Sequence, residues 1–185
     1  MLYLVTSNLN KFKEATLILD EYRLTLQHLP IEKLEIQAED IQEISEYAAK
    51  AILEQYNKKI LVEDAGLFID TLNGFPGPYS SYVYRSIGCE GILDLLKDET
   101  KRTATFKAVL SYGQSEKGVI SFIGEIKGQI VNSIRGSGGF GFDPIFMPNG
   151  SDKTFAEMSV SQKNQFSHRM RALKLFAEWY IQHAT

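Results

Sequence analysis

The sequence predicts an α/β protein built on a long mixed β-sheet flanked by helices. Short apolar runs typical of buried strands alternate along the chain with segments whose apolar residues recur at helical spacing. Two strand-like segments, 103–112 and 119–131, also follow each other directly, so strands are expected to pair both locally and across helices. About 44% of the 185 residues are apolar, which supports the core of one domain. We therefore expect residues 1–185 to form a single domain.

The first half of the chain opens with an apolar strand, Leu2–Val5, and a helix that carries Phe12, Ala15 and Ile18 at helical spacing. A second strand, a second helix, a short strand that runs into acidic residues and a turn-rich loop are expected next. Their expected ranges are, in this order, 24–29, 41–52, 59–66 and 73–81.

The second half is expected to hold a helix at 87–96, the two long strands and a glycine-rich loop at 136–144. The second long strand, 119–131, is expected to bend at Gly124 or Gly128. A helix with a continuous apolar stripe ends the chain.

Composition excludes several classes of protein. The formal net charge is −3, which does not favour general binding to nucleic acid or to an anionic membrane surface. Cys89 is the only cysteine, so an internal disulfide and a cysteine-based zinc cluster are both excluded. The sequence shows no basic-plus-apolar leader and no apolar run of about 18 residues. We expect a cytoplasmic protein.

The polar loop TSNLNK joins the first strand to the first helix. The first turn of that helix carries Lys11 and Lys13, although a helix N-terminus is already positive. A strand, a short polar loop and a helix start form a common anion site, in which Thr6 and Asn8 can also hydrogen-bond a phosphate or a base. The Walker pattern is absent. The alternative is that Asn8 or Asn10 caps a surface helix and the lysines are solvated.

A pair of acids, Glu63 and Asp64, is expected where an apolar strand ends, which is where α/β proteins place ligand-binding groups. Their carboxylates suit Mg²⁺, and one of them can accept a proton from an attacking water. The two side chains reach one site only if the strand ends between them. The stretch 32–46 adds six acids and one lysine, with Glu35 as a candidate metal ligand. The alternative is a solvated strand end and a solvated acidic loop.

Basic residues also crowd the start of the last helix. Ser159 and Ser167 are competing N-caps, and a start at Ser167 places His168, Arg169 and Arg171 at the positive end. Arginine binds phosphate oxygens bidentately, so this start suggests a polyanionic ligand. The alternative is an ordinary basic surface, with a structural or solvated histidine. The apolar stripe of this helix comprises Phe166, Met170, Leu173 and Ala177.

The loop GGFGFDP offers groups for a nucleobase. Its glycines allow the backbone to approach a ligand, Phe140 and Phe142 can stack on a base, and Asp143 can accept hydrogen bonds from its edge. The alternative is a bulged hairpin whose aromatic rings lie in the core. A P-loop, HExxH, GxSxG and CxxC are all absent, so hydride-transfer, protease and hydrolase-triad hypotheses have little support.

Together these segments describe a polyphosphate pocket with carboxylates and a base site, and the chain resembles the Ham1-like inosine triphosphate pyrophosphatase family almost end to end. The matching stretches are TSNLNK (6–11), LEIQ (34–37), VEDAG (62–66), GFPGPYS (74–80), GFGFDP (139–144), TFAEM (154–158), and Lys163 with residues 167–169 and Ala172.

The resemblance implies hydrolysis of a purine nucleoside triphosphate to the monophosphate and pyrophosphate. The implied substrates are ITP, dITP and XTP, whose removal keeps deaminated purines out of DNA and RNA. The family fold is a long mixed sheet in two lobes with the nucleotide in the cleft between them. The resemblance further implies a homodimer and a requirement for Mg²⁺.

The resemblance also assigns roles to residues. Asp64 accepts a proton from the attacking water, Glu63 assists it, and Asp64 and Glu35 hold the metal. The substrate-binding residues are Thr6, Ser7, Asn8, Leu9, Asn10, Lys11, Lys50, Ala65, Phe140, Gly141, Phe142, Asp143, Lys163, His168 and Arg169. Two positions depart from the family pattern: Ala65 replaces a serine or threonine, and Phe142 replaces a tryptophan seen in some relatives.

Two other functions stay open from the residues. One is a Maf-like pyrophosphatase with a different base preference. The donor-rich side chains of Lys163, His168 and Arg169 argue against it, because they favour a purine with a 6-oxo acceptor over adenine. The other is a non-catalytic nucleotide sensor, against which the retained acids argue.

Overall fold

A computed structural model of the protein describes residues 1–34, 36–115 and 118–183. The prediction of an α/β fold with a mixed sheet is confirmed. The helices are α1 (Leu9–Glu21), α2 (Ile41–Leu53), α3 (Ser80–Leu95), α4 (Val160–Phe166) and α5 (His168–His183). The strands are β1 (Leu2–Val5), β2 (Leu26–Leu29), β3 (Lys59–Ile69), β4 (Pro76–Gly77), β5 (Thr103–Gln114), β6 (Gly118–Ile130) and β7 (Phe146–Pro148). None of the helices in the described ranges is long and apolar enough to cross a membrane.

The strands follow the order β2-β1-β3-β5-β6-β7, and β4 pairs with β3. β1 lies parallel to both β2 and β3. β4 is antiparallel to β3, and β7 is antiparallel to β6, so the sheet is mixed. The chain divides into two compact units. Unit 1 comprises Met1–Asp64, Ala108–Gly124 and His168–Thr185, and unit 2 comprises Ala65–Lys107 and Glu125–Ser167.

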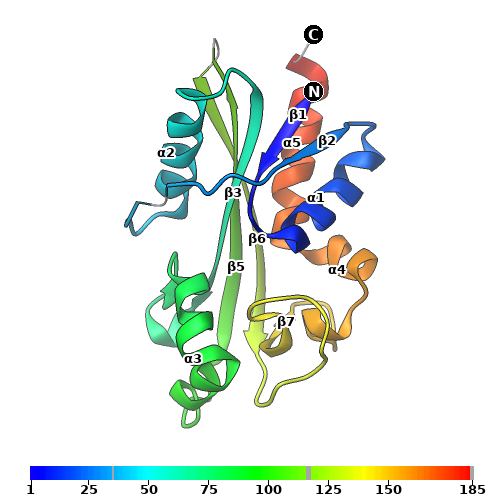
Figure 1. The fold of residues 1–185 in the computed structure, drawn as a ribbon. Helices are drawn as coiled ribbons and strands as arrows, with labels where there is room; N and C mark the ends of the chain where they lie inside the picture. The colour runs from blue at the N-terminus through cyan, green and yellow to red at the C-terminus, as the bar shows by residue number, and fades with distance from the viewer. Residues whose placement is uncertain (35, 116–117, 184–185) are drawn as a thin grey trace. The chain divides into compact units, whose positions relative to one another are not determined.

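In unit 1, successive residues of β1 and β3 point to opposite faces of the sheet. Both faces carry apolar side chains, and helices cover both of them. Val5 packs with Ala48, Ala49 and Ile52 of α2, where two fully buried alanines bring the helix close to the sheet. Leu4 faces the other way, toward α1 and α5, which lie side by side (Figure 1).

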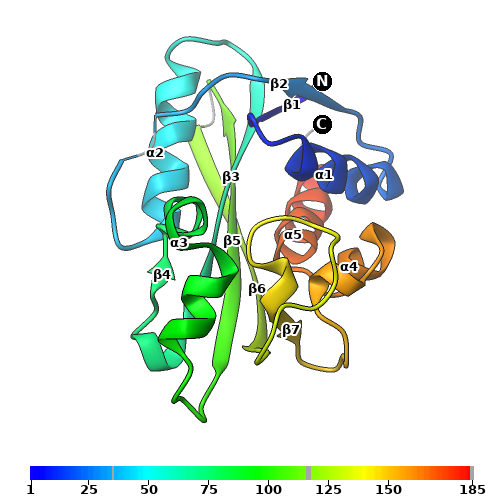
Figure 2. The same ribbon diagram turned by 60° about the horizontal axis from the view of Figure 1, so that its bottom comes forward.

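Unit 2 has its own core, in which Phe106, Phe146 and Phe155 pack as neighbouring rings. α3, drawn in green in Figure 2, contributes Val83, Cys89 and Ile92 to this core. The helix is interrupted at Gly88, whose φ of 66° lies outside the helical region. The expected loop at 73–81 is therefore shorter than predicted, because α3 begins at Ser80. The Ser80 hydroxyl accepts the Leu67 N–H at 2.8 Å and donates to the Gly77 carbonyl at 2.7 Å, which fixes this start.

Two further boundaries differ from prediction, and both matter for the site. β3 runs on to Ile69 and does not end between Glu63 and Asp64. β1 ends at Val5, opposite Val62, so both acids lie just past the end of the neighbouring parallel strand. The basic segment forms two helices, since Ser159 caps α4 in a capping box with Gln162 and α5 begins separately at His168.

Gly124 of β6 lies where the backbone of another element approaches closely, which was not predicted from the sequence. A Cβ at this position would collide with the carbonyl oxygen of His168 and with the amide nitrogen of Ala172. The first turn of α5 therefore rests directly on the β6 backbone. Gly128, further along β6, makes a similar approach to Met147 and Pro148 of β7.

Candidate functional site

The loop between β1 and α1 is held by its own polar side chains. The Asn8 Oδ1 accepts the backbone N–H groups of Asn10 at 2.9 Å and Lys11 at 3.3 Å, so Asn8 is the N-cap of α1. The Thr6 hydroxyl oxygen accepts the N–H of Asn8 at 3.1 Å. Such capping satisfies amide groups that a helix start otherwise leaves open, and it orders the loop.

Lys11 has an anionic partner within unit 1. Its ammonium nitrogen lies 3.0 Å from Oε2 of Glu63 and donates to the Glu63 backbone carbonyl at 3.2 Å. The Lys11 side chain is only 18% exposed, so the hypothesis of a solvated lysine is wrong for this residue, whereas Lys13 is exposed. Glu63 thus offsets the cost of a cation at the helix start.

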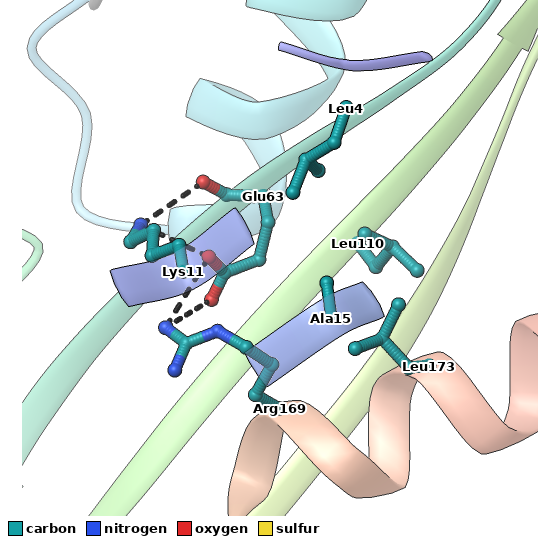
Figure 3. A pocket seen from close by; sticks show the side chains of 7 residues that line it. All are labelled: Leu4, Lys11, Ala15, Glu63, Leu110, Arg169 and Leu173. Carbon is teal, nitrogen blue, oxygen red and sulfur yellow. Dashed lines mark hydrogen bonds and ion pairs between the residues drawn. The ribbon is translucent and has the colours of Figure 1, made fainter. Parts of the chain in front are cut away.

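Arg169 joins the same cluster from the first turn of α5 (Figure 3). It is one of the largest fully buried side chains of the protein, and its Nη2 lies 3.0 and 3.3 Å from the two carboxylate oxygens of Glu63. Its Nη1 forms an ion pair with the Glu14 carboxylate of α1. The hypothesis of an ordinary basic surface therefore fails for Arg169, because its charge is held inside unit 1 by two acids.

Sequence reasoning missed Glu14. The signal was available, since Glu14 lies beside Ala15 on the stripe of α1 that the apolar spacing marks as buried. A charged residue on such a stripe is buried only if it is paired.

The charges around Glu63 determine its protonation. Burial alone would raise the pKa of this carboxyl, but Arg169, Lys11 and His168 outweigh that effect and hold the pKa well below its ordinary value. Burial also disfavours the charged form of Arg169. The carboxylates of Glu63 and Glu14 outweigh that effect and raise the pKa of Arg169 above its ordinary value. Glu63 and Arg169 are therefore both charged at neutral pH.

A small pocket adjoins this cluster. It is lined by parts of Lys11, Glu63 and Arg169 and by Leu4, Ala15, Leu110 and Leu173, and the surface that faces it is apolar (Figure 3). Its enclosed space is about that of a single water molecule. This pocket alone cannot enclose a nucleotide.

Asp64 has a different environment from Glu63, as expected for neighbours on a continuous strand. Its Oδ1 forms an ion pair with Lys33, from the segment between β2 and α2. Its Oδ2 is buried and has no hydrogen-bond partner among the residues that the structure describes. The two acids therefore serve different partners.

Asp64 offers a metal ion one carboxylate oxygen, Oδ2, which has no hydrogen-bond partner among the described residues. The predicted second ligand, Glu35, lies outside the described residues, and within those residues no group of three or more histidines, cysteines or acids could hold a metal. Mg²⁺ is commonly held by one or two carboxylates together with water and substrate phosphates. A single available carboxylate oxygen fits that ion.

In unit 2, the predicted base loop is organised by Asp143. Its Oδ2 accepts the ammonium of Lys163 at 2.6 Å and the N–H of Phe140 at 2.8 Å, and both charged side chains are buried. The Lys163 nitrogen lies 4.6 Å from the centre of the Phe140 ring. Gly139, with a φ of 70°, is required because a Cβ would collide with the Asp143 carboxylate.

The prediction that Phe142 stacks on a base is wrong. Phe142 is 2% exposed, belongs to the core of unit 2 and packs edge-on against Tyr84 at 5.5 Å between ring centres. The alternative of an aromatic ring in the core thus describes Phe142, and its ring presents no open face for stacking. Phe140 is the half-buried aromatic of this loop.

The other predicted residues are placed as follows. His168 is buried at the start of α5. Ser7 and Lys50 are exposed, the latter near the end of α2, and Ala65 is half-buried on β3. Leu9 and Asn10 are exposed in the first turn of α1, and Gly141 adopts a φ of 61° with open space at its Cβ position.

His28 of β2 is a second residue that sequence reasoning missed. Its Nε2 lies 2.8 Å from the Thr6 carbonyl oxygen, and its ring centre lies 4.8 Å from that of Phe12. A carbonyl only accepts, so Nε2 carries the proton and donates. His28 thereby fixes the end of β1 just before the capped loop.

Replacing His28 by Phe would keep the ring and remove the donor. We expect the free energy of unfolding, measured in urea, to fall by about 1 kcal/mol because a partly buried carbonyl loses its hydrogen bond. His28→Gln, which restores an N–H donor, is the control and should recover part of the loss. A His28→Phe protein as stable as the wild type would contradict this role.

Comparison with known proteins agrees with the resemblance seen in the sequence. The model of the Ham1 family matches residues 2–179. Proteins named dITP/XTP pyrophosphatase from Methanopyrus kandleri and Thermococcus kodakarensis are each 46% identical to this chain over 175 residues, covering 95% of it and 93% and 94% of the relatives. The solved structure of the Staphylococcus aureus Ham1 protein has a TM-score of 0.84 at 27% identity, covering 98% of this chain and 99% of that one. The chain belongs to the Ham1 family.

Proposed function

We propose that the protein is a Mg²⁺-dependent nucleoside triphosphate pyrophosphatase that acts on the non-canonical purine nucleotides dITP, ITP and XTP and releases the monophosphate and pyrophosphate. The observation that carries the proposal is the cluster of ion pairs at the start of α1, where Lys11, Arg169 and Glu63 meet. The activity named for the 46% identical relatives supports the same reaction.

The loop before α1 is proposed to bind phosphate through side chains. Asn8 already accepts the N–H groups of Asn10 and Lys11, so these amides are engaged within the helix cap. The Thr6 hydroxyl accepts one hydrogen bond and keeps its own proton to donate. Lys11, 18% exposed, adds a full positive charge beside it. Ser7, exposed in the same loop, adds a second hydroxyl.

Asp64 is proposed to orient the attacking water and to accept its proton. Glu63, predicted to assist it, instead holds Lys11 and Arg169, because β3 continues through both acids and turns their side chains to different partners. The buried Oδ2 of Asp64, which has no partner in the described part of the chain, is an acceptor ready for such a role. The same carboxylate, with Glu35 as the predicted second ligand, would hold Mg²⁺. When bound, Mg²⁺ would supply positive charge to the triphosphate oxygens. Attack at the α-phosphorus then releases pyrophosphate.

Unit 2 is proposed to contribute the recognition of the base. Lys163 presents N–H donors and no acceptor, and Asp143 holds it in place. A donor favours the 6-oxo group of hypoxanthine and xanthine, while the amine of adenine would face it unpaired. Phe140, beside the Lys163 ammonium, supplies an apolar surface for the base.

Product analysis tests the proposal. The protein is incubated with dITP, ITP, XTP, GTP and ATP, with and without Mg²⁺, and pyrophosphate is separated from orthophosphate. We expect pyrophosphate with IMP, dIMP or XMP, dependence on Mg²⁺, and little turnover of GTP and ATP. Orthophosphate with a nucleoside diphosphate would contradict the bond assignment. Turnover confined to other bases would indicate the Maf-like alternative, and tight ITP binding without turnover would indicate a sensor.

The homodimer and the cytoplasmic location remain predictions from the resemblance and from the composition of the chain. Sedimentation of the purified protein would test the first. A monomer at the enzyme concentration of the activity assay would contradict it.

A further inference from the structure

Lys33 is a cation outside the predicted site that contacts a residue within it. The stretch 32–46 contains six acids and this single lysine. The ion pair nevertheless joins Lys33 to Asp64, 31 residues further along the chain, on β3. The Lys33 side chain is 13% exposed and that of Asp64 is 15% exposed, so the pair is largely withdrawn from water.

The ion pair engages one of the two carboxylate oxygens of Asp64. Oδ1 is taken by the Lys33 ammonium, and Oδ2 is buried with no hydrogen bond to any residue in the described ranges. A divalent cation at Oδ2 would stand within a few ångströms of that ammonium. Two cations at such a distance, withdrawn from water, repel each other strongly.

The backbone around Lys33 can move so that the ammonium leaves Asp64. Residues 30–34 and 36–40, between β2 and α2, form no helix or strand. Moving Lys33 away from Asp64 therefore breaks no ladder of strand or helix hydrogen bonds.

We propose that Lys33 is a built-in counter-ion of Asp64, which neutralises the carboxylate while no divalent cation is bound and leaves it when the cation binds. Lys33 and the cation thus compete for Asp64. This inference rests on the proposed role of Asp64 as a metal ligand. It predicts that the cation affinity is set partly by a residue that is not a ligand.

The first test measures binding of Mn²⁺ to the nucleotide-free protein, from the electron paramagnetic resonance signal of the free ion. Lys33→Met should bind Mn²⁺ roughly three- to tenfold more tightly than the wild type. Lys33→Arg keeps the charge and the donors, so its affinity should stay within about twofold. Lys174→Met is the matched control, since Lys174 is 3.9 Å from Glu178 on α5 and half exposed. An unchanged or weaker affinity of Lys33→Met would overturn the proposal.

The second test needs no variant. The amine of Lys33 is labelled with an acetylating reagent, and the modified fraction is measured by mass spectrometry with and without Mn²⁺. Labelling should be slow without the ion and should rise at least about threefold with it, because ion pairing and burial protect an amine. Equal labelling in both states would show that Lys33 stays in place, and would overturn the proposal even if Lys33→Met binds more tightly through the loss of charge alone.

Asp64→Asn separates this proposal from the proposed function. If that variant loses Mn²⁺ binding while Lys33→Met gains nothing, only the counter-ion proposal is wrong. If Asp64→Asn binds Mn²⁺ as well as the wild type does, Asp64 is no metal ligand, and both assignments fail.

Discussion

Asp64→Asn should lower kcat by about 10²–10⁴-fold, the usual contribution of a positioned general base. The amide keeps the shape of the carboxylate but cannot take a proton from the attacking water. Substrate affinity, measured by calorimetry with a non-hydrolysable ITP analogue, should change far less than kcat because the Lys11 and Arg169 cluster depends on Glu63 and not on Asp64.

The matched control for this variant is Asp20→Asn, which makes the same chemical change at an exposed position of α1. Its kcat should equal that of the wild type. An Asp64→Asn enzyme with undiminished turnover would contradict the assignment of Asp64 as proton acceptor. Loss of binding together with turnover would show that Asp64 acts mainly in holding the substrate.

Arg169→Met should lower the free energy of unfolding by about 3–5 kcal/mol, as found when one partner of a buried ion pair is removed. Glu14 and Glu63 would remain buried, and Lys11 would be the cation left to compensate Glu63. Denaturation in guanidinium chloride at pH 7 measures the loss. Arg171→Met, a substitution of an exposed arginine two residues along α5, should have little effect.

A double variant tests the cause. Adding Glu14→Gln to Arg169→Met removes the charge of the buried carboxylate that has lost its arginine, and the double variant should be more stable than Arg169→Met alone. If Arg169→Met were as stable as the wild type, the buried cluster would contribute nothing to the fold. A stable variant with lost substrate affinity would restrict Arg169 to a binding role.

The same cluster predicts a pH dependence. The pKa of Glu63 is lowered in the folded protein, so its contribution to stability is fully present above the ordinary value of about 4.5 and is lost as the pH falls below it. Without Arg169 the pKa of Glu63 returns toward its ordinary value, because the largest opposing charge is gone. The difference in stability between wild type and Arg169→Met should therefore shrink on acidification below pH 4.5.

Local patterns predicted the elements that build the site. The apolar run Leu2–Val5, the Asn8 cap and the capping box at Ser159 all depend on residues a few positions apart, and each is found in the structure. The ends of β3 and α3 were less predictable. β3 continues through two acids because each finds a cation, and α3 begins at Ser80 because its hydroxyl reaches Leu67, 13 residues earlier.

The pairing of charges could not be predicted from periodicity. Glu14 and Arg169 are 155 residues apart in the chain, and Lys33 and Asp64 are 31 apart, so no local rule links them. The sequence predicts that Lys11 and Arg169 lie at helix starts, where a cation is unfavourable, and that Glu63 lies at the end of a strand. It does not say that they neutralise one another, because that depends on β3 and α5 both lying against α1.

The close contact at Gly124 has a consequence for how sequence variation in this protein should be interpreted. Gly124 carries no functional group, yet the first turn of α5, which bears His168 and Arg169, rests on its backbone. Even one added methyl group would push that turn outward, and the guanidinium would leave the two acids that hold it. A change from glycine to alanine there would resemble the loss of a charged residue, although every charged residue would still be present.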